Sequence, residues 1–90
     1  MRILIAEDDA GIGRAVQVLL ERSRYTADWV KTGPEALEWA SSGEYDAIIL
    51  DIMLPGMSGL EVLERLRAAG SRTPVLMLTA LTDVPARVRG

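Results

Sequence analysis

The chain alternates short apolar runs with longer segments whose apolar residues recur every three or four positions. Four segments have the length and composition of buried strands: residues 3–6, 25–30, 46–50 and 74–78. Four others show helical spacing: residues 10–24, 33–42, 59–69 and the shorter 84–90. Regular alternation of strand and helix predicts an α/β domain in which a parallel sheet carries helices on both faces.

Capping residues mark where the middle helices begin and end. Two of them open with a hydroxyl residue and a glutamate at capping-box spacing: Thr32 with Glu35, and Ser58 with Glu61. Gly43 and Gly70 follow these helices, where glycine commonly ends a helix. Leu60, Leu63 and Leu66 are predicted to share one face of the helix that Ser58 begins.

The composition excludes several kinds of chemistry. The 90 residues include no cysteine and no histidine, so disulfides, thiolate catalysis and imidazole bases or ligands are excluded. Any chemistry must use carboxylates, hydroxyls, Lys31, the arginines and the backbone. A net charge of −3 does not suggest a nucleic-acid binder, and no apolar stretch approaches the ~20 residues that span a membrane. We expect one cytoplasmic domain.

Acidic and hydroxyl residues stand where three of the predicted strands end. Glu7 and Asp8 follow the first strand, Asp51 the third and Thr79 the fourth. Because the carboxyl ends of parallel strands meet at one sheet edge, these side chains are expected to converge. Carboxylates that close raise each other's pKa unless a cation lies between them, and an all-oxygen site suits Mg²⁺ before Ca²⁺. A carboxylate beside Mg²⁺ can also attack phosphorus and form an aspartyl phosphate.

Each of these residues also has a purely structural explanation. Acidic residues after a strand often cap the next helix, and Asp8 or Asp9 can have that role alone. Asp51 can be an ordinary turn aspartate, and Thr79 an ordinary hydroxyl at a strand end. Their joint placement at one predicted sheet edge is what favours a shared site.

Two rival functions fit less well. Gly11 and Gly13 after a strand hint at a dinucleotide-binding loop, but Val16 stands where the third glycine should be. A phosphatase of the haloacid dehalogenase type would need a second aspartate two residues after its nucleophile, where this chain has Met53. The aromatic residues are predicted to be packing residues without a stacking role: Tyr25, Trp29, Trp39 and Tyr45.

Three stretches of the chain resemble the receiver domain of two-component response regulators. They are ILIAEDD at residues 3–9, DAIILDIMLPG at residues 46–56 followed by SGLEVL at 58–63, and PVLMLTA at residues 74–80. The resemblance covers all 90 residues and is greatest to the subfamily whose receivers precede a winged-helix DNA-binding domain. It implies a flavodoxin-like α/β fold whose parallel sheet has the strand order 2-1-3-4.

The resemblance also implies a role for each matching residue. Asp51 matches the phosphoacceptor, Asp8 a direct Mg²⁺ ligand, and Glu7 a ligand that acts through water. The backbone carbonyl of Met53 matches the third protein ligand, and Thr79 matches the switch hydroxyl. The family receives its phosphoryl group from a histidine kinase and normally regulates transcription through changed partner contacts. A signalling module that binds neither nucleic acid nor membrane directly is therefore expected, rather than an enzyme.

The chain departs from the family after its fourth strand. In the family a fifth strand with an essential lysine and a fifth helix follow, and Lys31 does not match that lysine. We therefore expect residues 1–90 to form a receiver domain that is incomplete at its C-terminal end. The apolar fourth strand would then be an exposed edge that favours self-association. The alternative function is a receiver that cannot be phosphorylated and acts as a structural, dimerising module.

Overall fold

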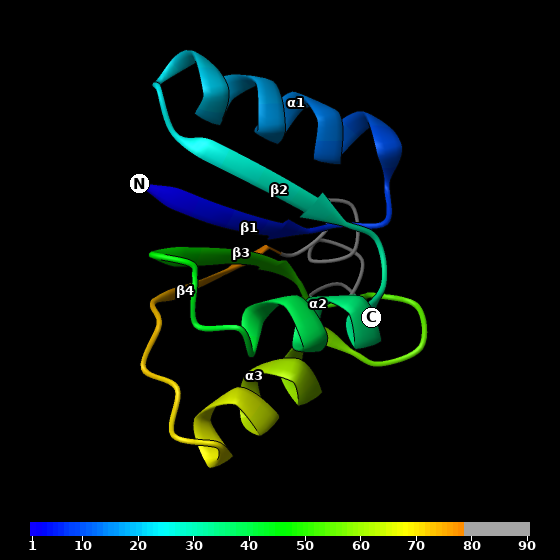
Figure 1. Ribbon diagram of the computed structural model, residues 1–90. Helices are drawn as coiled ribbons and strands as arrows, with labels where there is room; N and C mark the ends of the chain where they lie inside the picture. Colours follow the sequence, from blue (N-terminus) through cyan, green and yellow to red (C-terminus); the bar gives the residue numbers. More distant parts are fainter. Residues whose placement is uncertain (79–90) are drawn as a thin grey trace, which may run out of the picture.

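The computed structural model describes residues 1–78, which form a parallel four-stranded sheet with helices on both faces (Figure 1). The sheet order is β2-β1-β3-β4, which confirms the predicted α/β fold and its strand order. The expected helix at residues 84–90 lies outside the described residues. The elements are β1 (Arg2–Ala6), α1 (Ala10–Arg22), β2 (Thr26–Val30), α2 (Gly33–Ala40), β3 (Ala47–Asp51), α3 (Gly59–Ala68) and β4 (Val75–Leu78).

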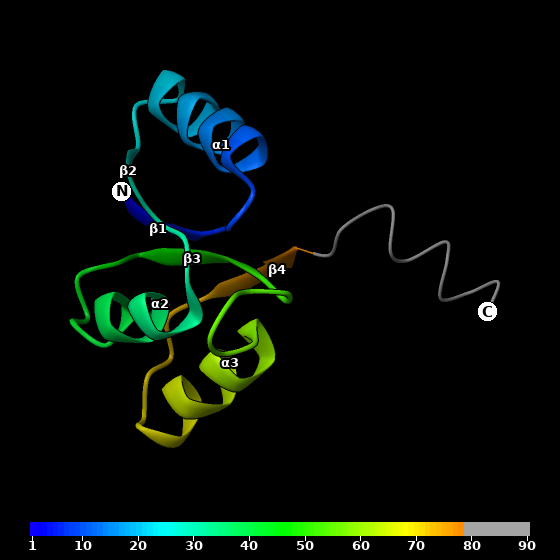
Figure 2. The same ribbon diagram turned by 90° about the vertical axis from the view of Figure 1, so that its right-hand side faces the viewer.

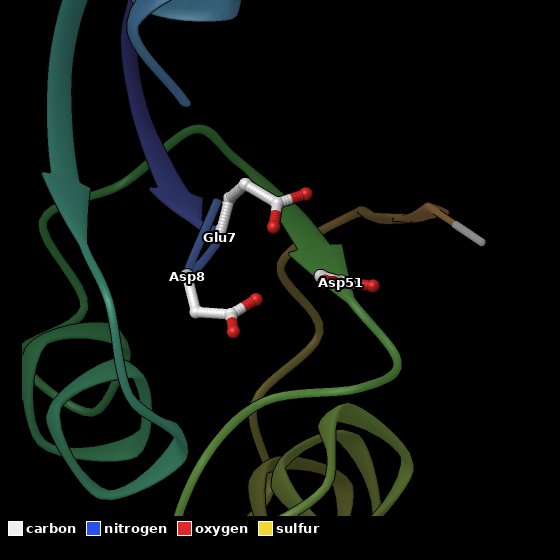
Figure 3. Close-up of side chains that lie close together, drawn as sticks. All are labelled: Glu7, Asp8 and Asp51. Carbon is white, nitrogen blue, oxygen red and sulfur yellow. The ribbon is translucent and has the colours of Figure 1, made fainter. Parts of the chain in front are cut away.

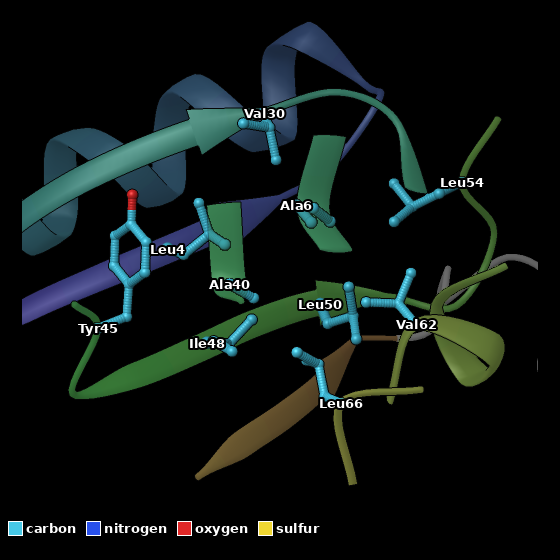
Figure 4. Close-up of a cluster of buried hydrophobic side chains, with 11 residues drawn as sticks. Leu4, Ala6, Val30, Ala40, Tyr45, Ile48, Leu50, Leu54, Val62 and Leu66 are labelled. Carbon is cyan, nitrogen blue, oxygen red and sulfur yellow. The ribbon is translucent and has the colours of Figure 1, made fainter. Parts of the chain in front are cut away.

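The sheet separates one helix from the other two. In the described chain α1 lies on one face, and α2 and α3 cover the other (Figure 2). Alternate strand residues supply the core between the sheet and the α2–α3 layer, because successive side chains of a strand point to opposite faces. The buried core cluster (Figure 4) comprises Leu4, Ala6, Val30, Ala36, Ala40, Tyr45, Ile48, Leu50, Leu54, Val62 and Leu66.

The register of the strands brings the chain out of the sheet at one edge. Ala6, the last residue of β1, pairs with Val30 of β2 on one side and with Leu50 of β3 on the other. Glu7 therefore follows β1 at the same height at which Asp51 follows Leu50 in β3. A parallel sheet in this register places both carboxylates at its carboxyl edge.

The predicted helix starts are confirmed by their caps. The hydroxyl of Thr32 accepts a hydrogen bond from the Glu35 N–H, and that of Ser58 accepts one from the Glu61 N–H, both at 3.2 Å. The second helix ends at Ala40, two residues before its predicted end, because residues 42 and 43 bond back only three positions, to Trp39 and Ala40. Gly43 completes the turn with a φ of 76°.

The buried faces of α1 and α3 differ from the apolar spacing of the sequence. In α3 the buried residues are Gly59, Val62 and Leu66, whereas Leu60 is 50% exposed. In α1 only Gly13 is fully buried. The cause in α1 is the surface beneath it, since among the described residues this helix packs mainly on β1 and β2, which form half of the sheet.

None of the helices within residues 1–78 is long and apolar enough to cross a membrane.

Candidate functional site

Three carboxylates gather at the carboxyl edge of the sheet. Glu7 and Asp8 come from the end of β1 and Asp51 from the end of β3, and their side chains point into one space (Figure 3). One carboxylate oxygen of each lies within 4.8 Å of the others. The structure thus brings together three of the residues that the sequence placed at this edge.

The surroundings of these carboxylates oppose their negative charge. Glu7 and Asp51 are only 4% and 7% exposed, while Asp8 faces solvent. Burial, with smaller contributions from the neighbouring Asp51 and Asp8, raises the pKa of the Glu7 carboxyl to about 7. Within residues 1–78 no arginine or lysine forms an ion pair with any of the three.

Asp9 takes the structural role that the sequence left open for it. Its side chain caps α1 by accepting a hydrogen bond from the Ile12 N–H at 3.0 Å. Its own backbone N–H donates to Glu7 Oε2, also at 3.0 Å. Asp9 therefore steadies the acidic group through its backbone, while its side chain serves the helix.

Two glycines at helix starts hold the loop that follows Asp51 through backbone hydrogen bonds. The Gly59 N–H donates to the carbonyl of Ile52 at 2.8 Å, and the Gly33 N–H donates to the carbonyl of Pro55 at 3.0 Å. A Cβ on Gly59 would overlap the carbonyl oxygen of Asp51, so only glycine permits this approach. The starts of α2 and α3 thus hold the loop that carries Met53.

Met53 contributes its backbone to this site. Its N–H donates to Asp51 Oδ1 at 3.2 Å and so restrains the rotation of that carboxylate. The Met53 side chain is 55% exposed. Thr79, the predicted switch hydroxyl, lies outside the described residues.

The donor set fits a hard divalent cation. It consists of oxygen atoms only, two of the three carboxylates are buried, and no positive side chain in the described chain is paired with them. Such a cluster favours Mg²⁺ or Ca²⁺ over softer metals. Asp8, Asp51 and Glu7 are the side chains that could hold it.

Trp29 takes part in this region although it was predicted to be a packing residue. Its indole Nε1–H donates to the backbone carbonyl of Glu7 at 2.8 Å. The partners are 22 positions apart, so no local sequence pattern indicates the bond. Gly13 is the one available clue, because a Cβ there would overlap the indole ring. Gly13 therefore makes room for Trp29, which gives this glycine a role in packing.

Comparisons with known proteins agree with this geometry. Residues 3–90 match the family model of the response regulator receiver domain. The chain is 53% identical over 90 residues to the transcriptional activator protein IrlR of Burkholderia pseudomallei. It is 48% identical over 88 residues to the transcriptional regulatory protein YkoG of Bacillus subtilis. The matches cover 100% and 98% of this chain, but it spans only 39% of each relative's length.

Solved receiver structures share the fold. The non-phosphorylated HemR receiver domain from Leptospira biflexa has a TM-score of 0.81 and 35% identity, over 99% of this chain and 72% of that one. The response regulator TrrA from Thermotoga maritima, in complex with Mg²⁺-BeF, has a TM-score of 0.83 and 38% identity, over 91% and 71%. The fold, the acidic edge and these similarities show that the chain belongs to the family of response regulator receiver domains.

Proposed function

We propose that the chain is a phosphoacceptor module of two-component signal transduction, which receives a phosphoryl group on Asp51 from a histidine kinase. The observation that carries this proposal is the position of Asp51, buried at the end of β3 with carboxylate oxygens of Glu7 and Asp8 within 4.8 Å. Membership of the receiver family supports it, as does the solved Mg²⁺-BeF complex of the related TrrA.

The residues of the acidic edge would hold Mg²⁺. Asp8 and Asp51 would supply carboxylate oxygens, Met53 its backbone carbonyl, and Glu7 a carboxylate that acts through water. When bound, Mg²⁺ offsets the negative charge of the carboxylates and of the incoming phosphoryl oxygens. Because burial raises the pKa of the Glu7 carboxyl to about 7, binding of the cation near neutral pH would displace a proton from Glu7.

Asp51 is the nucleophile in the proposed step. One of its carboxylate oxygens attacks phosphorus, and the bond from phosphorus to the donor's imidazole nitrogen breaks with its electron pair going to that nitrogen. The hydrogen bond from the Met53 N–H to Asp51 Oδ1 keeps the carboxylate oriented during the attack. The product is an acyl phosphate whose phosphoryl group carries roughly −1.5 to −2 units of charge in place of the single charge of the carboxylate, and Thr79 would respond to this group.

Intact-mass measurement tests the proposed phosphorylation. With Mg²⁺ and a small acyl phosphate, the chain should gain the mass of one phosphoryl group, and Asp51→Asn should abolish the gain. Asp9→Asn is the matched control, because asparagine also caps helices and the Asp9 backbone bond to Glu7 is kept. A wild-type chain that gains no mass would contradict the proposal and would fit a purely structural module.

The edge strand β4 is proposed to bind a second copy of the chain. In the described residues β4 pairs only with β3, and its Leu76 is 61% exposed. Two such strands can pair edge to edge and cover each other's apolar side chains.

The chain would act in the cytoplasm as a signalling module, not as a metabolic enzyme. Regulation of transcription is proposed for the whole protein, since the relatives named transcriptional regulators are much longer than this chain.

A further inference from the structure

The end of β2 holds the backbone on both sides of the Glu7 α-carbon. The Glu7 N–H donates to the carbonyl of Val30 at 3.0 Å. The Glu7 carbonyl accepts the indole N–H of Trp29 at 2.8 Å. Both bonds come from the end of β2, next to the register pair Ala6 and Val30. The Glu7 carbonyl is part of the peptide that joins Glu7 to Asp8. The orientation of that peptide affects where the side chains on either side of it point, and these are two carboxylates of the acidic edge.

Trp29 is itself held in a fixed position. Its ring packs so closely against α1 that a Cβ on Gly13 would overlap it. The Lys31 Nζ lies 5.0 Å from the ring centroid, a distance that allows cation–π attraction. Because the helix and the cation already restrain the ring, the Trp29 side chain loses little further conformational freedom when its N–H forms a hydrogen bond. The indole is therefore a pre-organised donor to the Glu7 carbonyl.

We propose that Trp29 is a positioning residue for the acidic site, whose indole N–H fixes the Glu7–Asp8 peptide and thereby sets the affinity for Mg²⁺. The inference rests on the proposed function, because it requires Mg²⁺ at this edge. The physical cause is that a ligand already in its bound orientation loses less freedom on binding. Residues that orient metal ligands commonly change metal affinity by an order of magnitude or more when they are replaced.

Titration of the full chain with Mg²⁺, followed by the amide NMR shifts of residues 7, 8 and 51, tests this inference. Trp29→Phe keeps an aromatic ring but removes the donor, and it should weaken the apparent Kd about tenfold. Trp39→Phe is the matched control. Trp39 lies with Arg2 and Tyr45 around a pocket of about 300 Å³ at the start of β1, so the Kd should stay unchanged within about twofold.

A second variant separates the hydrogen bond from the packing. Benzothienylalanine at position 29 has the shape of tryptophan with sulfur in place of the N–H, so it keeps the contact with Gly13. We expect it to weaken Mg²⁺ binding as Trp29→Phe does, with an unfolding midpoint without Mg²⁺ closer to that of the wild type. If this variant binds Mg²⁺ with the wild-type Kd, the positioning role of Trp29 is overturned while the proposed metal site stands. The variant also tests the inference if Trp29→Phe does not fold. A wild-type chain without a Mg²⁺ response overturns both this inference and the proposed metal site.

Discussion

The protonation of the Glu7 carboxyl depends strongly on the groups around it. It is 4% exposed and lies near Asp51 and Asp8, and its carboxyl pKa is raised to about 7. In an unfolded chain a glutamate has a pKa of about 4.3. Between these two values the folded state binds more protons than the unfolded state. The stabilisation from a protonated Glu7 is therefore complete below about pH 4.3 and is lost as the pH rises through 7.

This difference predicts a measurable dependence of stability on pH. Without Mg²⁺, the Glu7 contribution should lower the free energy of unfolding by about 3 kcal/mol between pH 4.5 and 7.5. Urea denaturation of the wild type and of Glu7→Gln at several pH values measures it as the difference between the two curves. Glu64→Gln, at an exposed residue of α3, should have the same dependence of the free energy of unfolding on pH as the wild type. Identical curves for the wild type and Glu7→Gln would contradict the raised pKa.

The same shift predicts how Mg²⁺ binding depends on pH. A cation binds the deprotonated carboxylate, so the apparent affinity for Mg²⁺ should rise as the pH increases through about 7. In Glu7→Gln this rise should be much smaller, because no proton is released at that position. Calorimetric titration in two buffers of different ionisation enthalpy measures the released protons directly, and equal proton release in both proteins would exclude Glu7 as the source.

At the scale of the element, α1 shows how a helix is adapted to the residue beneath it. Glycine is a poor residue for a helix interior and costs about 1 kcal/mol relative to alanine. Gly13 is nevertheless the one fully buried residue of α1, because Trp29 occupies the space that a side chain would need. Gly11 in the same helix is exposed, and a Cβ there would meet only the Asp9 side chain, at 3.3 Å.

These two glycines should respond in opposite ways to the same substitution. Gly13→Ala should destabilise the chain by about 2 kcal/mol, since the overlap with Trp29 outweighs the gain in helix propensity. Gly11→Ala should be neutral or slightly stabilising. Urea denaturation of both variants, at one pH and without Mg²⁺, makes the comparison. A more stable Gly13→Ala would show that the contact with Trp29 is loose.

At the scale of the whole molecule, the two faces of the sheet are covered unequally. Within residues 1–78, α2 and α3 pack on one face, while α1 on the other face packs mainly on β1 and β2. The exposed apolar residues of the described chain include Leu76 on the edge strand β4, and Ile12 and Leu19 on α1. An apolar edge of this kind is a common site of association between chains.

Self-association through β4 should therefore be sensitive to charge at Leu76. We expect the average mass measured by light scattering to rise with concentration in the wild type and to rise less in Leu76→Glu, because an edge charge opposes strand pairing. Leu60→Glu is the matched control, since Leu60 is 50% exposed and lies at the start of α3. A wild-type chain that is monomeric at the highest concentration would exclude the association.

Local features of the sequence determined much of the fold. Helix capping by Thr32 and Ser58 depends on residues within a few positions of one another, and so do the apolar runs that form the strands. The structure has these helix starts and strands nearly where they were expected. The sequence also placed Glu7, Asp8 and Asp51 at strand ends, and a parallel sheet brings such ends to one edge. The resemblance to receiver domains supplied the strand order, which the alternation of strands and helices leaves open.

Only the tertiary structure decided which contacts form between distant segments. The bond from Trp29 to Glu7 requires β2 to lie beside β1, and the contact of Trp29 with Gly13 requires α1 to pack closely on β2. No local pattern encodes either arrangement. The buried face of α3 likewise depends on where that helix rests on the core, so Leu66 is buried and Leu60 is exposed. Short-range energies thus determined the elements and their ends, whereas packing between elements determined the environment of Glu7.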